Sequence, residues 1–166
     1  QNDVQASMSG GSLVSRGGGK FIARPTSVGN PVTISVSAKG RKIGEYKFRV
    51  RKLPDPAPYI AMGADRFKSG ALSKAALMSA SGIHAAIDDG LLDIPFSVTS
   101  FRTVFFDNMG NAVPLASNGS QFSAQQKEQF RHLSRNKRFY ITNVVVHGPD
   151  GTTRTLNGRN MEVIVQ

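Results

Sequence analysis

The fold of this chain is decided around residues 42–60, KIGEYKFRVRKLPDPAPYI. In the first half, apolar and basic residues alternate with a period of two, which is typical of a strand with one buried face. The expected buried side holds Tyr46, Phe48 and Val50, and the opposite side holds Lys47, Arg49 and Arg51. The second half differs, because three of the eight prolines of the chain fall within five residues there.

The prolines of residues 54–58, PDPAP, occupy every second position: Pro54, Pro56 and Pro58. Each proline fixes its own φ and favours extended geometry in the residue before it. We therefore expect a short rigid linker that holds two domains at a nearly fixed angle, which a Gly/Ser tether does not do.

The charge distribution also changes at this linker. Residues 1–54 contain ten Lys or Arg and two acidic residues, whereas residues 55–166 contain eleven and nine. A change in charge density beside a stiff segment indicates a domain boundary. We predict one domain over residues 1–53 and a second over residues 59–166.

Short strands separated by glycines make up the first domain. They are expected at 3–8, 11–15, 20–25, 31–38 and 42–52. Five strands in about fifty residues predict an immunoglobulin-like sandwich, complete or lacking its first strands.

The second domain is predicted to be β-rich with two short helices. The helix near 73–81 has Ser73 as N-cap and Gly82 as its C-terminal stop. The helix near 124–134 begins with a Ser123–Gln126 capping box and buries Phe130 and Leu133. Strands are expected at 83–88, 95–107, 138–148, 152–156 and 159–165.

Two further features refine the predicted strands. The apolar side of residues 95–107 changes between Val98 and Phe101, which indicates a bulge or bend. Asp-Gly at 150–151 and Asn-Gly at 157–158 are hairpin turn pairs, and they predict that the last three strands form a meander. The expected fold class is therefore mainly β, with two β-rich domains.

The sequence resembles the periplasmic C-terminal region of the PorM/GldM family along nearly its whole length. The resemblance rests on five stretches: GKFIARP (19–25), PVTISVSA (31–38), YKFRVRKLPDPAPYIA (46–61), LSKAALMSASGIHAAIDD (72–89) and IPFSVTSFRTVF (94–105). The most specific part is the strand-to-proline junction followed by the serine-led helix.

This resemblance implies a structural, non-enzymatic component of the type IX secretion and gliding machinery. The family forms an elongated homodimer, anchored in the inner membrane by an N-terminal helix that assembles with a PorL/GldL-type motor partner. Its C-terminal domains reach toward the outer-membrane-associated ring of PorK and PorN. Since the chain begins at Gln1 and has no membrane-spanning run or signal-peptide pattern, we expect a piece of a longer protein that lies in the periplasm.

Motifs for catalysis or metal binding are weak. There is no cysteine. The stretch SRGGGKF (15–21) has Val14 and Phe21 where a phosphate-binding loop needs Gly and Ser or Thr. His84, His132 and His147 lack metal-ligand spacing, and Asp88, Asp89 and Asp93 flank a turn that they are expected to cap. We predict no enzyme activity, no cofactor and no metal.

The basic side chains leave three interpretations open. Lys47, Arg49 and Arg51 can form a docking surface, or can be a solvated edge that prevents aggregation. Nucleic-acid binding is disfavoured because Tyr46 and Phe48 are expected on the buried side, away from the basic face. Arg135, Lys137 and Arg138 form a second candidate protein-interaction cluster, where the simpler role is favourable charge after a helix.

A different class of function is a β-sandwich module that binds a ligand or glycan. Such a site needs a cluster of exposed aromatic side chains. The chain has no Trp and only three Tyr, which weakens this alternative.

Overall fold

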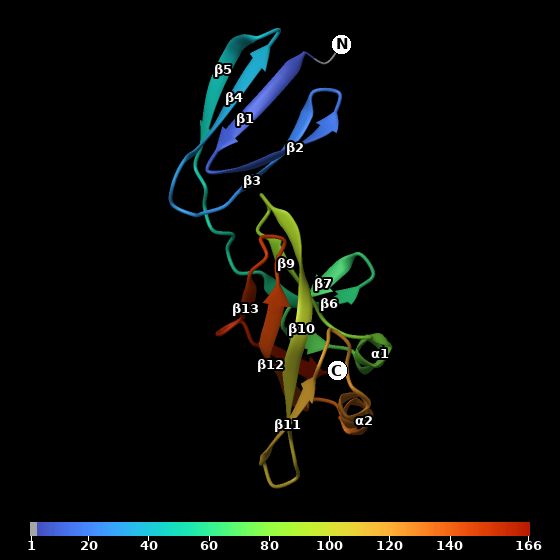
Figure 1. Cartoon of the computed structure of the whole chain (residues 1–166). Coiled ribbons are helices and arrows are strands. Elements are labelled where there is room, and N and C mark those ends of the chain that lie inside the picture. Colours follow the sequence, from blue (N-terminus) through green and yellow to red (C-terminus); the bar gives the residue numbers. More distant parts are fainter. Residues whose placement is uncertain (1–2) are drawn as a thin grey trace. The chain divides into compact units, whose positions relative to one another are not determined.

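The computed structural model describes residues 3–166 and divides the chain into two compact units, Gln1–Leu53 and Pro54–Gln166 (Figure 1). Strands dominate both units, and the described residues form two short helices. The prediction of a mainly β chain is confirmed.

The N-terminal unit has five strands in two sheets. A three-stranded antiparallel sheet has the order β1-β4-β5, and β2 pairs with β3 as a separate hairpin. The strands are β1 (Val4–Ser9), β2 (Gly11–Gly17), β3 (Lys20–Pro25), β4 (Val32–Ala38) and β5 (Arg41–Phe48). An immunoglobulin-like arrangement of these strands stays a prediction.

The last strand of this unit, β5, differs in two ways from the strand expected over residues 42–52. β5 ends at Phe48, so Arg49 and Arg51 follow the strand instead of extending it to residue 52. Tyr46 and Phe48 are each 53% exposed, although they were expected in the core. The alternation correctly predicts which side chains share a face, but β5 lies at the edge of its sheet and its apolar side chains stay exposed within this unit.

The C-terminal unit is built on a large mixed sheet with the order β7-β6-β9-β10-β12-β14-β8. Short β11 pairs with β10, and β13 pairs with β12. The strands are β6 (Ala57–Met62), β7 (Asp65–Phe67), β8 (Gly70–Leu72), β9 (His84–Asp88), β10 (Asp93–Phe106), β11 (Ala112–Ser117), β12 (Arg138–His147), β13 (Thr153–Thr155) and β14 (Met161–Val165).

The expected bulge lies in β10, the longest strand. Its pairing with β12 shifts register at Val98, Ser100 and Arg102, which confirms the change of side predicted between Val98 and Phe101.

The predicted meander of the last three strands is wrong. β13 and β14 both pair with β12, one beside Val145–His147 and the other beside Arg138–Ile141. The Leu156 N–H donates to the Val144 carbonyl (2.8 Å), so the chain leaves the short β13 still attached to β12. The Asn157-Gly158 turn therefore carries the chain further along β12 instead of reversing it into a new hairpin.

The expected linker over 54–58 overlaps a strand that the sequence analysis missed. β6 begins at Ala57, and its Pro58 lies opposite Ala85 of β9. Proline is tolerated because β7 pairs only with residues 60–62, which leaves one side of β6 open at Pro58. Pro56 and Pro58 are buried, whereas Pro54 is exposed.

The two helices, α1 (Lys74–Ser79) and α2 (Ala124–His132), lie on the same side of the large sheet (Figure 1). Ser73 caps α1, and the Ser123–Gln126 capping box of α2 is present as predicted. Gly82 does not stop α1, which ends at Ser79 with Ala80 as its C-cap. Instead Gly82 bridges to Gln121, and a Cβ at this position would lie 2.1 Å from the Ser120 carbonyl oxygen.

An aromatic cluster fills the core between α2 and the sheet. Phe130 of α2 packs against Phe105, Phe122 and Phe139, with ring centroids 5.9, 4.9 and 5.2 Å away. Phe101 packs edge-on against Phe122. Leu133, which was expected to be buried, is only half-buried because it forms the C-cap of α2.

Candidate protein-interaction sites

The sheet of the N-terminal unit has one polar and one apolar face. Lys47 lies opposite Thr33, whereas Tyr46 and Phe48 lie opposite Ile34 and Val32. Of the hydrophobic side chains described in this unit, only Val32 is buried. The apolar face is thus largely open to contact from outside the unit.

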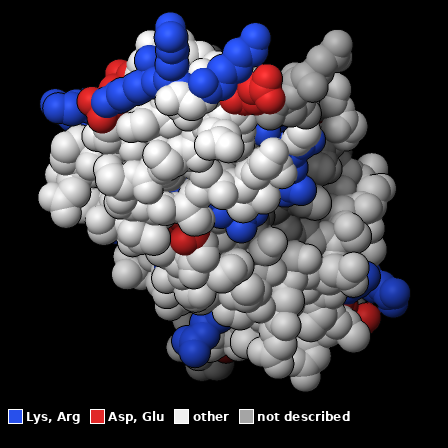
Figure 2. Space-filling view, turned by 45° about the horizontal axis from the view of Figure 1, so that its top comes forward, with Lys and Arg blue, Asp and Glu red and all other residues white. Residues whose placement is uncertain are grey.

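The cations of this unit have few acidic partners. Glu45 forms an ion pair with Lys42 (3.0 Å), which lowers the pKa of Glu45. Between residues 3 and 53, no salt bridge involves Lys47, Arg49 or Arg51. In the view of Figure 2, most of the charged side chains are Lys or Arg.

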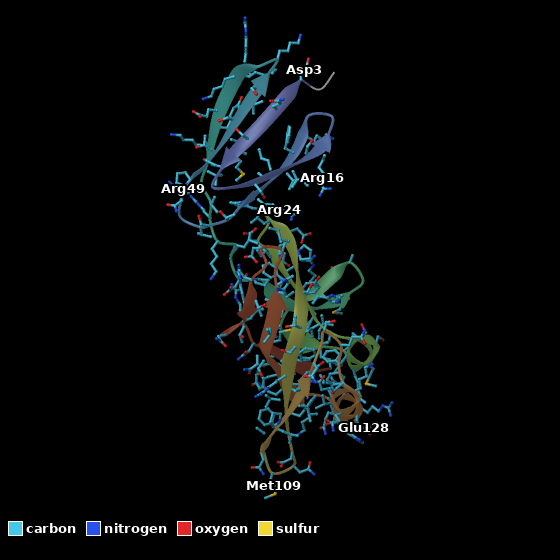
Figure 3. All side chains as sticks on the ribbon, in the orientation of Figure 1. Asp3, Arg16, Arg24, Arg49, Met109 and Glu128 are labelled. Atoms are coloured by element: carbon cyan, nitrogen blue, oxygen red, sulfur yellow. The ribbon has the colours of Figure 1, made fainter. Side chains whose placement is uncertain are left out.

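A groove of about 600 Å³ lies beyond the end of β5. Arg49, Arg51 and Lys52 line it together with Val28 and Val50 (Figure 3 labels Arg49). Of the predicted basic face, only Lys47 therefore lies on the strand, and the two arginines border this groove instead.

The C-terminal unit contains a second groove, of about 740 Å³. It lies between the end of β10, the end of α2 and the loop leading into β12. Phe106 lines it, is 47% exposed and packs edge-on against Tyr140. Lys137 and Arg138 also line this groove, whereas Arg135 is exposed on the same loop without lining it.

The loop that presents these cations is firmly held. Lys74 donates from Nζ to the carbonyl oxygens of Arg131 and Leu133 (2.7 and 2.9 Å), which caps the end of α2. The Asn136 N–H donates to the Val165 carbonyl (2.8 Å), and the Val165 N–H donates to the Lys137 carbonyl (2.9 Å). Asn136 has a φ of 69°, a left-handed conformation that asparagine tolerates.

Asp107, the acidic residue that lines this groove, accepts hydrogen bonds from backbone N–H groups. The Asp107 carboxylate accepts from the N–H groups of Met109 and Asn111 (2.9 and 2.8 Å). These hydrogen bonds lower the pKa of Asp107, that from Asn111 most. They also fix the turn between β10 and β11, whose tip is Met109, 86% exposed (Figure 3).

Arg138 is neutralised in part by Glu162, which lies 3.2 Å away. Across residues 3–166, no salt bridge involves Arg135 or Lys137. The groove thus combines an exposed aromatic ring, a fixed loop and Lys137, a cation for which the described residues show no salt bridge. The sequence analysis singled out the cations but missed Phe106 and Met109, which have no distinguishing pattern in the sequence.

The start of the C-terminal unit is anchored by Arg154, which the sequence analysis also missed. Its guanidinium donates to the Pro54 carbonyl (3.0 Å), to Asp55 (3.1 Å) and to Asp150 (2.8 Å). Hydrogen bonds from the Thr152 hydroxyl and N–H, and then from Arg154, lower the pKa of Asp150 to about 2. Residues 54–55 are therefore tied to the body of the C-terminal unit.

The aspartates near residue 90 have structural partners. Asp88 pairs with Arg66 and Lys68 (3.2 and 2.6 Å), and Asp89 accepts from the N–H groups of Leu91 and Leu92. Within residues 3–166 the structure contains no cluster of three or more His, Asp or Glu side chains that could hold a metal ion. The ring of Tyr59 stacks on His84 and lies under Arg66.

These features define a class of protein: a two-unit β-rich module with exposed basic and apolar side chains on its surface. Residues 54–166 match the family model of the GldM C-terminal domain, and residues 1–51 match that of the GldM third domain. The chain belongs to the GldM family, a structural component of gliding-motility and type IX secretion machinery. No curated protein sequence matches the chain.

The C-terminal domains of this family are periplasmic. Neither helix in the described part of the chain is long and apolar enough to cross a bilayer.

Proposed function

We propose that this chain is the non-enzymatic, periplasmic end of a shaft that links the inner-membrane motor to the outer-membrane-associated ring. The PorL/GldL-type motor partner would act through the N-terminal part of the parent protein. The PorK/PorN-type ring proteins would contact the C-terminal unit.

The groove beside Phe106 is the observation that carries this proposal. A partly exposed aromatic ring in a groove that an arginine also lines is typical of the centre of a protein interface, because aromatic side chains and arginine dominate such contacts. The loop with Lys137 is already fixed by hydrogen bonds. Binding there would therefore cost little additional ordering.

A binding assay with purified ring proteins tests the proposal. We expect the combined substitutions Phe106→Ala and Lys137→Glu to weaken binding of the 166-residue chain at least about tenfold. The matched control is Lys127→Glu, an exposed change of the same charge on α2 outside the groove. Equal affinity of the groove variant and the control would reject the groove as the docking site.

We also propose that the parent homodimer includes contacts of the N-terminal unit. Val14 and Ile22 form a cross-strand pair on the β2–β3 hairpin, and both are exposed. A second copy would bury them, which stabilises a unit with little core of its own. Sedimentation equilibrium should show dimerisation that Val14→Ser with Ile22→Ser weakens. A dimer unaffected by these substitutions would place its contact elsewhere.

The prolines contribute a stiff connection in this proposal, because a shaft transmits motion only if its joints resist bending. Pro54 is the informative position, since Pro56 and Pro58 are buried in the C-terminal unit. Pro54→Gly should broaden the size distribution in small-angle scattering and leave the unfolding of the C-terminal unit nearly unchanged. An unchanged scattering profile would show that Pro54 does not set the stiffness.

A further inference from the structure

β5 is an open edge of the N-terminal sheet. Within its unit this strand pairs with β4 alone, along the eight residues Arg41–Phe48. The outward backbone groups of an edge strand can pair with another strand, so proteins usually keep such edges short or cover them. This edge is neither short nor covered within its unit.

The exposed side chains of β5 are large and apolar as well as basic. Ile43 is 62% exposed, and Tyr46 and Phe48 are 53% exposed. Ile43 lies at the register shift between β4 and β5, where it has no residue opposite it. Lysine on an edge strand protects it from aggregation. Three exposed apolar side chains on the same strand instead indicate an interaction surface.

The groove beyond β5 extends this surface. Its apolar lining comes from Val28, Pro31 and Val50, and the N–H of Gly29 donates to the Val50 carbonyl (3.2 Å). Val28 is 59% exposed. Since residues 49–52 directly follow β5, an extended segment that pairs with β5 would reach this groove.

Charge decides which occupant fits. The segment 41–52 contains six basic residues and one acidic residue, Glu45, which already pairs with Lys42. A second copy of β5 would oppose like charges across the new pair, which is unfavourable. A segment with alternating acidic and apolar residues would place carboxylates beside the lysines and arginines, and an apolar residue at the groove.

We propose that β5 accepts an extended acidic segment of a partner protein as a fourth strand of the sheet β1-β4-β5. Main-chain hydrogen bonds would provide affinity, and Val28, Val50 and the surrounding cations would provide specificity. This site is on the N-terminal unit and is independent of the groove beside Phe106, so either proposal can fail without the other.

The probe is a nine-residue peptide of alternating glutamate and valine, acetylated and amidated, titrated into the 166-residue chain. We expect saturable binding, together with slower amide exchange confined to β5. A peptide N-methylated at every residue keeps the charge but lacks the backbone donors on both of its edges, and should bind at least about tenfold more weakly. Lys47→Glu should also weaken binding, whereas Lys20→Glu on the hairpin should not.

Several outcomes would overturn the proposal. Equal binding of the N-methylated peptide would mean that charge alone holds the probe. Protection of amides outside β5 would also overturn the proposal. So would equal binding of the peptide by the Lys47→Glu variant, or no binding of the peptide by the wild-type chain. Slower exchange in β5 that depends on protein concentration without peptide would assign the edge to a second copy. Unchanged exchange in β1 and β4 before peptide is added serves as the control that the N-terminal unit of each variant is folded.

Discussion

The two units of this chain use similar strands but bury them very differently. Among the described residues, the C-terminal unit buries 22 hydrophobic side chains, whereas the N-terminal unit buries one, Val32. The C-terminal sheet has two helices and a phenylalanine cluster on it. The N-terminal sheet leaves Ile43, Tyr46 and Phe48 more than half exposed.

This difference shows that an alternating apolar and polar pattern is sufficient to form a strand but does not by itself produce a buried hydrophobic core. A unit of 53 residues is already small for independent stability, and one with a single buried hydrophobic residue has little to offset its conformational entropy. We infer that the C-terminal unit is stable by itself and that the N-terminal unit gains stability from contacts outside it.

The largest effect is expected at the centre of the C-terminal core. Phe130→Ala should destabilise this unit by about 3–5 kcal/mol, because it removes a buried ring and leaves a cavity. Chemical denaturation monitored on the C-terminal unit measures the change. Phe106→Ala is the matched control at a half-exposed position, and an equal loss in both variants would contradict the proposed location of the core.

A smaller loss is expected at Gln126, a fully buried polar residue of α2. Its Nε2 donates to the Leu115 carbonyl (3.2 Å) and its Oε1 accepts from the Ser123 N–H (2.9 Å). Gln126→Ala should lower the free energy of unfolding by about 1–3 kcal/mol, because the Leu115 carbonyl and the Ser123 N–H both lose their hydrogen-bond partner. Gln125→Ala, on the exposed side of the same helix, should stay within about 0.5 kcal/mol. The same denaturation assay applies, and similar losses would argue against the capping box as the cause.

Acid should weaken the C-terminal unit in part through Asp150. Since the folded state lowers the pKa of Asp150 from 3.8 to about 2, its stabilising contribution is present above pH 4. That contribution is lost as the pH falls through about 2. Asp150→Asn retains an acceptor for Thr152 but does not titrate. The variant should therefore lose less stability than the wild type between pH 5 and pH 2, and parallel losses would show that Asp150 is not responsible.

The smallest effect is expected on the exposed edge of the N-terminal unit. Phe48→Ala should change the stability of the 166-residue chain by less than about 0.5 kcal/mol, because its ring is more than half exposed. Thermal unfolding measures this, with Val32→Ala as the contrasting buried variant on the opposing strand. A large loss from Phe48→Ala alone would mean that this ring is buried in solution.

Local patterns predicted the local structure well. The alternation of residues 31–38, the Ser123–Gln126 capping box and the change of side near Val98 correspond to β4, the start of α2 and the β10 bulge. Each depends on residues close in sequence, so its physical cause is visible in a short window.

Features that depend on distant partners were not predictable in this way. The contacts of Arg154 with Pro54 and Asp55 span about a hundred residues. β13 and β14 both pair with β12, and the turn residues between these strands do not show which strand each of them pairs with. In the candidate site, the sequence predicted Lys137 and Arg138 but not Phe106, because exposure of an aromatic residue is decided by what packs over it.

The central claim, that the C-terminal unit is stable by itself and the N-terminal unit is not, is tested most directly by hydrogen exchange on the intact 166-residue chain. At a concentration where the chain is monomeric, we expect amides of β2, β3, β4 and β5 to exchange at least about a hundredfold faster than those of β10 and β12. Exchange in β2 and β3 should slow when the chain dimerises, and exchange in β5 should slow when it binds a partner, while β12 stays the same. Equal protection of β4 and β12 in the monomer would contradict the account, because it would show that the N-terminal unit has a stable core of its own.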